Sequence, residues 1–310
     1  MPAPISNSTE IGKKAEEFLD YLSVERGSSP LTIRNYRHYL RRFNNWLKSQ
    51  NIRQNLKDIN QDIVRSYRIY LSNLPAGKDK TLSRRTQGYH VIALRSFLKW
   101  LRKGGKEVLD FEKIEVPKFA SSKLFFLKGL EVEGLLNMPD IKKVRGKRDR
   151  AILEVFYATG LRVSELTSLN RDSLVQDRSQ LLIPPIGGKV SRTVFLSSRA
   201  FGWIDTYLKS RKDSLKPLFI SHKGESSRLT PRSVQRMIKK YAKKIGLFSD
   251  VTPKTLRHSF ATDLLIAGAE LGSVQEMLGH KNISTTQIYT HVTNKQLRDV
   301  HRAFHGKGGN

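Results

Sequence analysis

Apolar residues recur at helical spacing along most of the chain, and this periodicity restricts the fold more than any other feature of the sequence. In residues 32–47, "TIRNYRHYLRRFNNWL", one helical face would carry Ile33, Tyr36, Leu40, Phe43 and Leu47. Thr32 is expected to cap this helix. Residues 59–74 and 86–105 repeat the pattern, and the latter end in a Gly-Gly pair typical of a helix stop. The first hundred residues therefore predict a small bundle of about four helices.

One stretch departs from helical spacing. The runs "QLLIPP" (180–185) and "RTVFL" (192–196) are rich in β-formers and flank a turn that contains two glycines. Two such runs around a glycine turn predict a β-hairpin. The predicted fold class is therefore mainly α-helical with a small β-hairpin or sheet, which lies in a mixed second domain.

The segment between the two regions indicates where the domains divide. Residues 106–122, "KEVLDFEKIEVPKFASS", lose the helical period and contain Pro117. We expect a helical domain at 1–110, a linker at 111–122 and a larger domain at 123–310.

The excess of basic residues is large and is spread over both domains. The chain has 56 Lys and Arg against 28 Asp and Glu, a net charge of +28. Residues 1–120 hold 23 basic and 12 acidic side chains (+11), which leaves +17 for residues 121–310. A basic tail would concentrate the excess, whereas a nucleic acid that touches both domains accounts for its spread. The alternative is a surface charge that only maintains solubility.

Several classes of protein and site are excluded. The chain has no cysteine, which excludes disulfides, thiolate zinc sites and cysteine nucleophiles. The N-terminal residues lack the apolar run of a secretory signal, and no stretch of about 18 apolar residues would span a membrane. We expect a soluble, cytoplasmic protein with no membrane partner.

Basic faces of two predicted helices are candidates for contact with nucleic acid. The second of these helices, at 229–246, is expected to start at Thr230-Pro231. Polar residues lie outside its apolar face, as expected for a helix that faces a DNA groove. The candidates are Arg34, Arg37 and Arg41 in the first helix and Arg232, Gln235 and Lys239 in the second. A merely solvated face is the alternative for the three arginines of the first helix.

The chain lacks the clustered carboxylates that hold divalent ions in many nucleases and polymerases, and it lacks HExxH, Walker-type and GxSxG motifs. We therefore expect no metal and no other cofactor. Arg162 in "ATGLRVSEL" and Arg257 in "TPKTLRHSFATDLL" lie in apolar surroundings instead. Two guanidinium groups could grip phosphate oxygens and neutralise charge in a pentacoordinate transition state. Arg162 could also pair with Glu165, and the two roles are compatible.

Three further residues are ordinary when each is taken alone. Lys189 would be a solvated charge in the expected turn, and His280 follows "EMLG" like a histidine at a helix C-terminus. Tyr289 would be a packing residue, because an unactivated tyrosine, with a pKa of about 10, is a poor nucleophile. Their occurrence together with the two arginines favours a common site.

Three segments occur in order, "ATGLRVSEL", "TLRHSFATDLL" and "LGHKNISTTQIYTHV". Together they strongly resemble the tyrosine recombinase (phage integrase) family, and within it the Xer site-specific recombinases. The resemblance covers almost the whole chain. It implies an N-terminal SAM-like core-binding bundle and a mixed α/β catalytic domain that ends in a protomer-docking helix.

The resemblance implies a role for each matching residue. Arg162 and Arg257 match the two catalytic arginines, Lys189 the hairpin lysine that protonates the leaving 5′-oxygen, and His280 the "LGH" histidine. Tyr289 matches the nucleophile, whose attack gives a 3′-phosphotyrosine link and then a Holliday junction. Because this link conserves bond energy, rejoining would need neither metal nor ATP. The implied function is resolution of chromosome or plasmid dimers.

The chain departs from the family pattern in two places. Xer proteins usually have "TPHTLRH", and this chain has "TPKTLRH", which places Lys254 where histidine is usual. Lysine can donate to a phosphate but accepts a proton less readily, so any base role would fall more heavily on His280. In the hairpin, Lys189 falls one position earlier than the family lysine.

The resemblance also implies partners. These are double-stranded DNA with a specific recombination site, a homo- or hetero-tetramer on two duplexes, and a cell-division DNA translocase as activator. The tail at 292–306 would dock on a neighbouring protomer or pack on its own subunit. The rival functions are an integrase of a mobile element or phage, a type IB topoisomerase-like enzyme, and a DNA-binding protein with a decayed active site.

Overall fold

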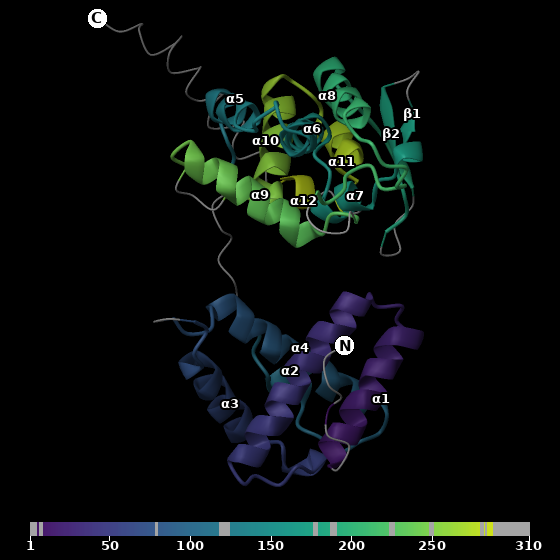
Figure 1. Cartoon of the computed structure of the whole chain (residues 1–310). Coiled ribbons are helices and arrows are strands. Elements are labelled where there is room, and N and C mark those ends of the chain that lie inside the picture. The colour runs from purple at the N-terminus through teal and green to yellow at the C-terminus, as the bar shows by residue number, and fades with distance from the viewer. Residues whose placement is uncertain are drawn as a thin grey trace, which may run out of the picture. The chain divides into compact units, whose positions relative to one another are not determined.

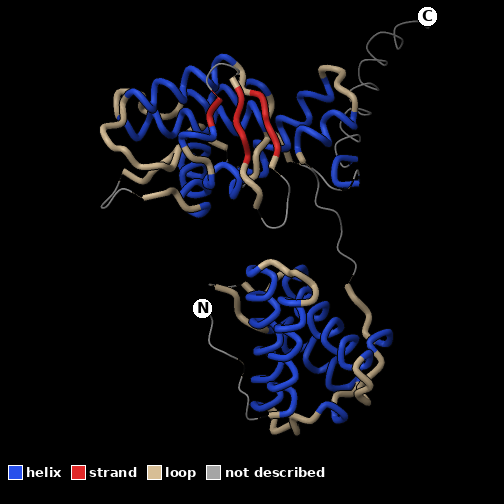
Figure 2. The backbone as a smooth tube through the Cα atoms, turned by 90° about the vertical axis from the view of Figure 1, so that its right-hand side faces the viewer, coloured by secondary structure: helices blue, strands red, loops and turns tan. Residues whose placement is uncertain are grey.

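The chain divides into two compact units, Met1–Ser122 and Lys123–Asn310 (Figure 1), and each unit has a large apolar core of its own. The computed structural model describes residues 5, 9–77, 80–117, 125–175, 179–186, 191–222, 227–247, 251–279, 282 and 284–287. Helices predominate in both units, and the strands lie in the second (Figure 2). Among the helices described, none is long and apolar enough to cross a membrane.

The first unit is a helical bundle, as its periodicity predicts. Its described α-helices are α1 (Glu10–Val24), α2 (Pro30–Ser49), α3 (Gln61–Asn73) and α4 (Arg84–Lys103). Side chains of Thr9, Ser29, Asn60 and Ser83 cap their N-termini. The expectation that Thr32 caps α2 is wrong. Pro30 already occupies the first helical turn, so the Thr32 backbone N–H donates to the Ser29 hydroxyl at 3.2 Å.

Chain beyond α4 continues to pack against this bundle. A short 3₁₀ helix, η2 (Phe111–Lys113), follows α4, and Arg95 Nε donates to the Phe111 carbonyl at 3.0 Å. Ile114 is buried in the same apolar core as Phe43 and Phe97. The non-periodic segment therefore contributes packing to the first unit up to Ile114. The expected boundaries of the linker remain a prediction.

The second unit combines helices with a small antiparallel sheet. Its described helices are α5 (Gly129–Asn137), α6 (Val144–Thr159), α7 (Val163–Ser168), α8 (Ser198–Lys209), α9 (Pro231–Lys244), α10 (Pro253–Ile266), α11 (Leu271–Leu278) and α12 (Ser284–Gln287). The sheet has the order β1 (Leu174–Val175), β2 (Gln180–Ile183), β3 (Arg192–Phe195), and Leu181 pairs with Val194. The two predicted strands are confirmed. β1 has only two residues, too few to give a period in the sequence.

Helix α6 forms the centre of the second unit, and α8 and α10 pack against it. It is buried from Arg148 to Phe156, and the charged residues of this stretch are paired. Arg150 bonds to Glu154 at 2.7 Å, and both side chains are buried. Arg199, from α8, donates to the other oxygen of Glu154 at 2.9 Å. Buried charge in α6 is thus neutralised within the core.

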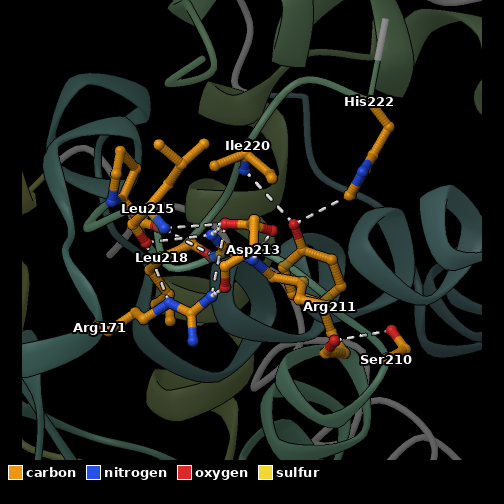
Figure 3. A network of polar contacts seen from close by, with 10 residues as sticks. Arg171, Ser210, Arg211, Asp213, Leu215, Leu218, Ile220 and His222 are labelled. Carbon is orange, nitrogen blue, oxygen red and sulfur yellow. Dashed lines mark hydrogen bonds and ion pairs between the residues drawn. The ribbon is translucent and has the colours of Figure 1, made fainter. Parts of the chain in front are cut away.

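A polar network holds the segment that follows α8 (Figure 3). The side chain of Arg211 is fully buried; it pairs with Asp213 and donates to the Pro217 carbonyl at 2.7 Å. The hydrogen bond from Arg211 lowers the pKa of Asp213, which keeps the pair charged at neutral pH. The Leu218 N–H in turn donates to the Leu169 carbonyl at 2.9 Å. The network therefore fixes the end of α7, the helix that follows Arg162.

Candidate active site

Arg162 and Arg257 reach one place from two different segments. Gly160 ends α6 with a left-handed φ of 59°, and Arg162 follows two residues later as the N-cap residue of α7. Arg257 lies in the second turn of α10 and is 6% exposed. Its Nη1 donates to the Gly160 carbonyl at 2.6 Å, which ties α10 to the turn that carries Arg162.

The two guanidinium groups share an acceptor at the end of α11. Arg257 Nη2 donates to the Leu278 carbonyl at 2.8 Å, and Arg162 Nη1 donates to the same oxygen at 3.3 Å. Arg162 Nη2 also donates to the Gly279 carbonyl at 3.3 Å. Carbonyls at a helix C-terminus carry partial negative charge, so they are suitable acceptors for two cations. The structure thus brings together the two arginines that the sequence singles out.

Arg162 remains accessible at this site. Its side chain is 30% exposed, and it also pairs with Glu165 at 3.0 Å, as the spacing of three residues allows. Within the described residues its guanidinium makes hydrogen bonds to Glu165, Leu278 and Gly279. A guanidinium has about five N–H donors, so donors remain for a ligand such as a phosphate.

A third arginine, which the sequence motifs do not identify, lies at this site. Arg192, at the start of β3, donates from Nη1 and Nη2 to the two oxygens of Glu165, each at 2.9 Å. Burial alone would raise the pKa of Glu165, but hydrogen bonds from Arg192 and from the Arg162 backbone N–H outweigh burial and hold that pKa at about 2. Glu165 is therefore a carboxylate at neutral pH. No signal in the sequence separates Arg192 from a solvated strand residue.

Lys254 lies close to Arg257 on the same helix. It is exposed in the first turn of α10, three residues before Arg257, so the two residues are neighbours on the helix surface. His258, one residue beyond Arg257, is buried. Burial together with Lys254 and Arg257 lowers the pKa of His258 to about 4, so it is neutral at pH 7. Lys254 thus adds positive charge to this end of α10.

Three expected site residues, Lys189, His280 and Tyr289, lie outside the described residues. Their roles remain predictions. The described chain runs up to Gly279 directly before His280, and the hairpin strands β2 and β3 flank the segment that contains Lys189.

The candidate DNA-contacting residues differ in their surroundings. On α9, Arg232, Gln235 and Lys239 are exposed, whereas the opposite face, with Val234, Met237 and Ile238, is buried. On α2, Arg34 is exposed and Arg41 is half-buried. Arg37 donates to Glu16 of α1 at 2.7 Å, so part of its donor capacity is used within the bundle. Contact with DNA remains a prediction for all six residues.

Family models account for both units. A model described as the phage integrase family matches residues 126–296, and one described as the N-terminal SAM-like domain of phage integrases matches residues 15–105. The chain belongs to the phage integrase family of tyrosine recombinases. The SAM-like bundle and the catalytic domain implied by the sequence motifs are thereby confirmed.

The relatives of this recombinase point to the Xer group. Tyrosine recombinase XerD of Lacticaseibacillus casei is 37% identical over 301 residues, which cover 94% of this chain and 98% of that protein. XerD of Listeria monocytogenes serotype 4b (strain F2365) is 39% identical over 303 residues, 94% of this chain and 97% of that protein. These relatives show an enzyme of site-specific recombination, and they favour an Xer-type recombinase over a mobile-element integrase.

A solved structure shares the fold of the recombinase. The crystal structure of XerH site-specific recombinase bound to palindromic difH substrate is 23% identical and has a TM-score of 0.71. The match covers 97% of this chain and 92% of that chain. The mainly α-helical fold with a small sheet is thereby confirmed.

Proposed function

We propose that this recombinase cuts and rejoins double-stranded DNA at a specific site, with Arg162 and Arg257 as the clamp on the scissile phosphate and Tyr289 as the nucleophile. One observation carries the clamp: the two guanidinium groups, from α10 and from the turn before α7, both donate to the Leu278 carbonyl. Two cations repel each other, so they converge only where negatively polarised groups hold them. Here the α11 carbonyls and Glu165 supply that support.

The clamp suits phosphoryl transfer through a pentacoordinate transition state. Arginine stays charged when partly buried, and its fork of donors fits two phosphate oxygens. Arg257 is nearly buried and held from two sides, whereas Arg162 is accessible. Donors fixed before the reaction stabilise developing charge without reorganisation. Lys254, exposed one turn before Arg257, adds a further cation for the same phosphate.

The covalent steps rest on the match to the family motifs. The Tyr289 oxygen attacks the phosphorus, the bond to the 5′-oxygen breaks, and Lys189 gives that oxygen a proton. His280 assists proton transfer from Tyr289. The products are a 3′-phosphotyrosine and a 5′-hydroxyl. The reverse reaction with the 5′-hydroxyl of a partner strand rejoins the chain, so the number of phosphoester bonds is unchanged and no ATP or metal is consumed.

The partners follow from the charge and from the relatives. Both units are strongly basic, and α9 presents an exposed polar face of the kind that enters a DNA groove. We propose a tetramer on two duplexes, activation by a cell-division DNA translocase, and a cytoplasmic location with the chromosome. The substrate would be a chromosome or plasmid dimer, in line with the XerD relatives.

A plasmid assay tests this function. A supercoiled plasmid carries two direct copies of a site that the recombinase binds, and the products are separated on a gel. We expect two smaller circles, with Holliday junctions trapped at early times. Relaxed plasmid of unchanged size would indicate a topoisomerase-like enzyme. Bound but unaltered plasmid, both without and with a translocase domain, would contradict the proposal.

A further inference from the structure

Arg192 makes the most complete ion pair at the candidate site, although no step of the proposed reaction uses it. Its two terminal nitrogens donate to the two oxygens of Glu165, each at 2.9 Å. This is a bidentate pair with two parallel hydrogen bonds, a geometry that suits guanidinium and carboxylate. The side chains of Arg192 and Glu165 are 18% and 3% exposed. The pair joins β3 to α7 at the residue three positions after Arg162.

The guanidinium of Arg192 also lies against the end of α11. A Cβ atom added to Gly279 would come within 2.9 Å of Arg192 Cζ, so a side chain at position 279 would displace it. Gly279 also has a left-handed φ of 62°. Its carbonyl accepts from Arg162 Nη2, so Arg162 and Arg192 contact the same residue.

Arg162 and Arg192 compete for one carboxylate. Glu165 accepts from Arg162 Nη1 at 3.0 Å and from the Arg162 backbone N–H at 2.8 Å, in addition to its two bonds from Arg192. An ionised carboxylate offers about four acceptor positions, so Glu165 is saturated. Because Arg192 bonds to both oxygens, the Arg162 guanidinium cannot form a bidentate pair with Glu165.

The balance of charge at the site also indicates that Arg192 limits how Arg162 pairs with Glu165. Arg162, Arg192 and Arg257 carry three positive charges against the single negative charge of Glu165. Without Arg192, the carboxylate would have Arg162 as its remaining guanidinium partner among the described contacts. Arg162 would then turn toward Glu165 and offer fewer donors to a phosphate.

We infer that Arg192 is a positioning residue for strand cleavage, which keeps both oxygens of Glu165 occupied and so leaves the Arg162 guanidinium available to the scissile phosphate. The inference rests on the proposed phosphate clamp. Arg192 acts through Arg162 and Glu165, and it need not touch the DNA.

Substrate chemistry separates this role from a merely structural one. Arg192→Ala is compared with the wild type on nicked suicide duplexes whose scissile group is a phosphate or a methylphosphonate, which lacks one negative charge. Single-turnover cleavage is measured at saturating DNA. On the phosphate, we expect Arg192→Ala to cleave roughly 10- to 100-fold more slowly, because a misplaced clamp loses transition-state stabilisation. On one methylphosphonate stereoisomer we expect the gap to shrink to about 3-fold or less, because the oxygen that Arg162 would neutralise is gone.

Arg199→Ala is the matched control. Arg199 is likewise the second arginine on a buried glutamate, Glu154, which Arg150 also binds. We expect this variant to cleave the phosphate substrate within about 3-fold of the wild type, since no described contact links it to the arginine clamp. An equal slowing of Arg192→Ala and Arg199→Ala would overturn the inference, and so would an equal slowing of Arg192→Ala on both substrates.

A double variant covers the case in which Arg192→Ala folds poorly. Arg192→Ala with Glu165→Gln leaves no unpaired buried carboxylate and removes the charge that would attract Arg162. Per folded molecule, we expect it to cleave at least about 5-fold faster than Arg192→Ala alone. A double variant no faster than the single one would contradict the competition. Failure of the wild type to cleave the phosphate substrate would instead contradict the proposed function.

Discussion

Gly160→Ala should disrupt the site at the turn that holds Arg257. Gly160 adopts a φ of 59°, which alanine rarely adopts. A Cβ atom there would lie 2.5 Å from Phe260 Cδ1 and 2.8 Å from Leu278 Cδ2. Both neighbours belong to the small apolar cluster around α10 and α11. The Gly160 carbonyl is also an acceptor for Arg257 Nη1.

The loss of folding stability in Gly160→Ala can be worked out from its backbone conformation and these contacts. The left-handed backbone costs alanine about 1–2 kcal/mol, and an extra carbon in a packed core costs about 1–3 kcal/mol. The free energy of unfolding of the catalytic unit should therefore fall by about 2–5 kcal/mol. For a unit of this size, that lowers Tm by about 4–20 °C. Displacement of the carbonyl should also slow DNA cleavage by about 10-fold or more at temperatures where the variant is folded.

Thermal unfolding and single-turnover cleavage measure the two effects. Gly202→Ala is the control, because Gly202 lies in α8 with no atom within 4 Å of an added Cβ. This control should gain up to about 1 kcal/mol and cleave normally. The reasoning is refuted if the free energy of unfolding of Gly160→Ala lies within about 0.5 kcal/mol of the wild-type value.

Three further outcomes are expected. Arg162→Ala should bind DNA as the wild type does but cleave it about 10²- to 10³-fold more slowly, and wild-type cleavage would contradict the clamp. Lys254→His should remain active, because histidine is usual there in Xer proteins; complete loss of cleavage would mean that the site depends on the lysine. Burial, Lys254 and Arg257 lower the pKa of His258 from 6.5 to about 4, so between these values the unfolded chain binds a proton that the folded chain does not. Above about pH 6.5 His258 should not lower the free energy of unfolding, which should then fall by up to roughly 3 kcal/mol as the pH drops to about 4. His258→Gln should reduce this slope in urea titrations, and an unchanged slope would contradict the assignment.

Local signals explain what the sequence could predict. Helix periodicity and the Thr230-Pro231 start identify α9, which begins at Pro231 with the Thr230 side chain as cap. Two β-rich runs on either side of a Gly-Gly pair identify the hairpin strands. Arg162 and Arg257 stand out because each lies in an otherwise apolar stretch, and both reach the end of α11.

Contacts between distant segments explain what it could not. The pair of Arg192 with Glu165 joins residues 27 positions apart, and nothing local to either residue indicates the other. The need for glycine at position 279 depends on where the Arg192 side chain lies. In the same way, the pairing of Arg37 with Glu16 depends on how α1 packs on α2. Such long-range partners are set by the tertiary fold.

Trapping the covalent intermediate tests the central claim most directly. A nicked suicide duplex that carries a site bound by the recombinase is incubated with the recombinase in the presence of EDTA. The protein is then denatured, and the residue that carries the DNA is mapped by mass spectrometry. We predict a DNA fragment linked to Tyr289, formed without metal, and no adduct with Tyr289→Phe although that variant binds the duplex. An adduct on another residue, or cleavage that requires a divalent metal, would contradict the account.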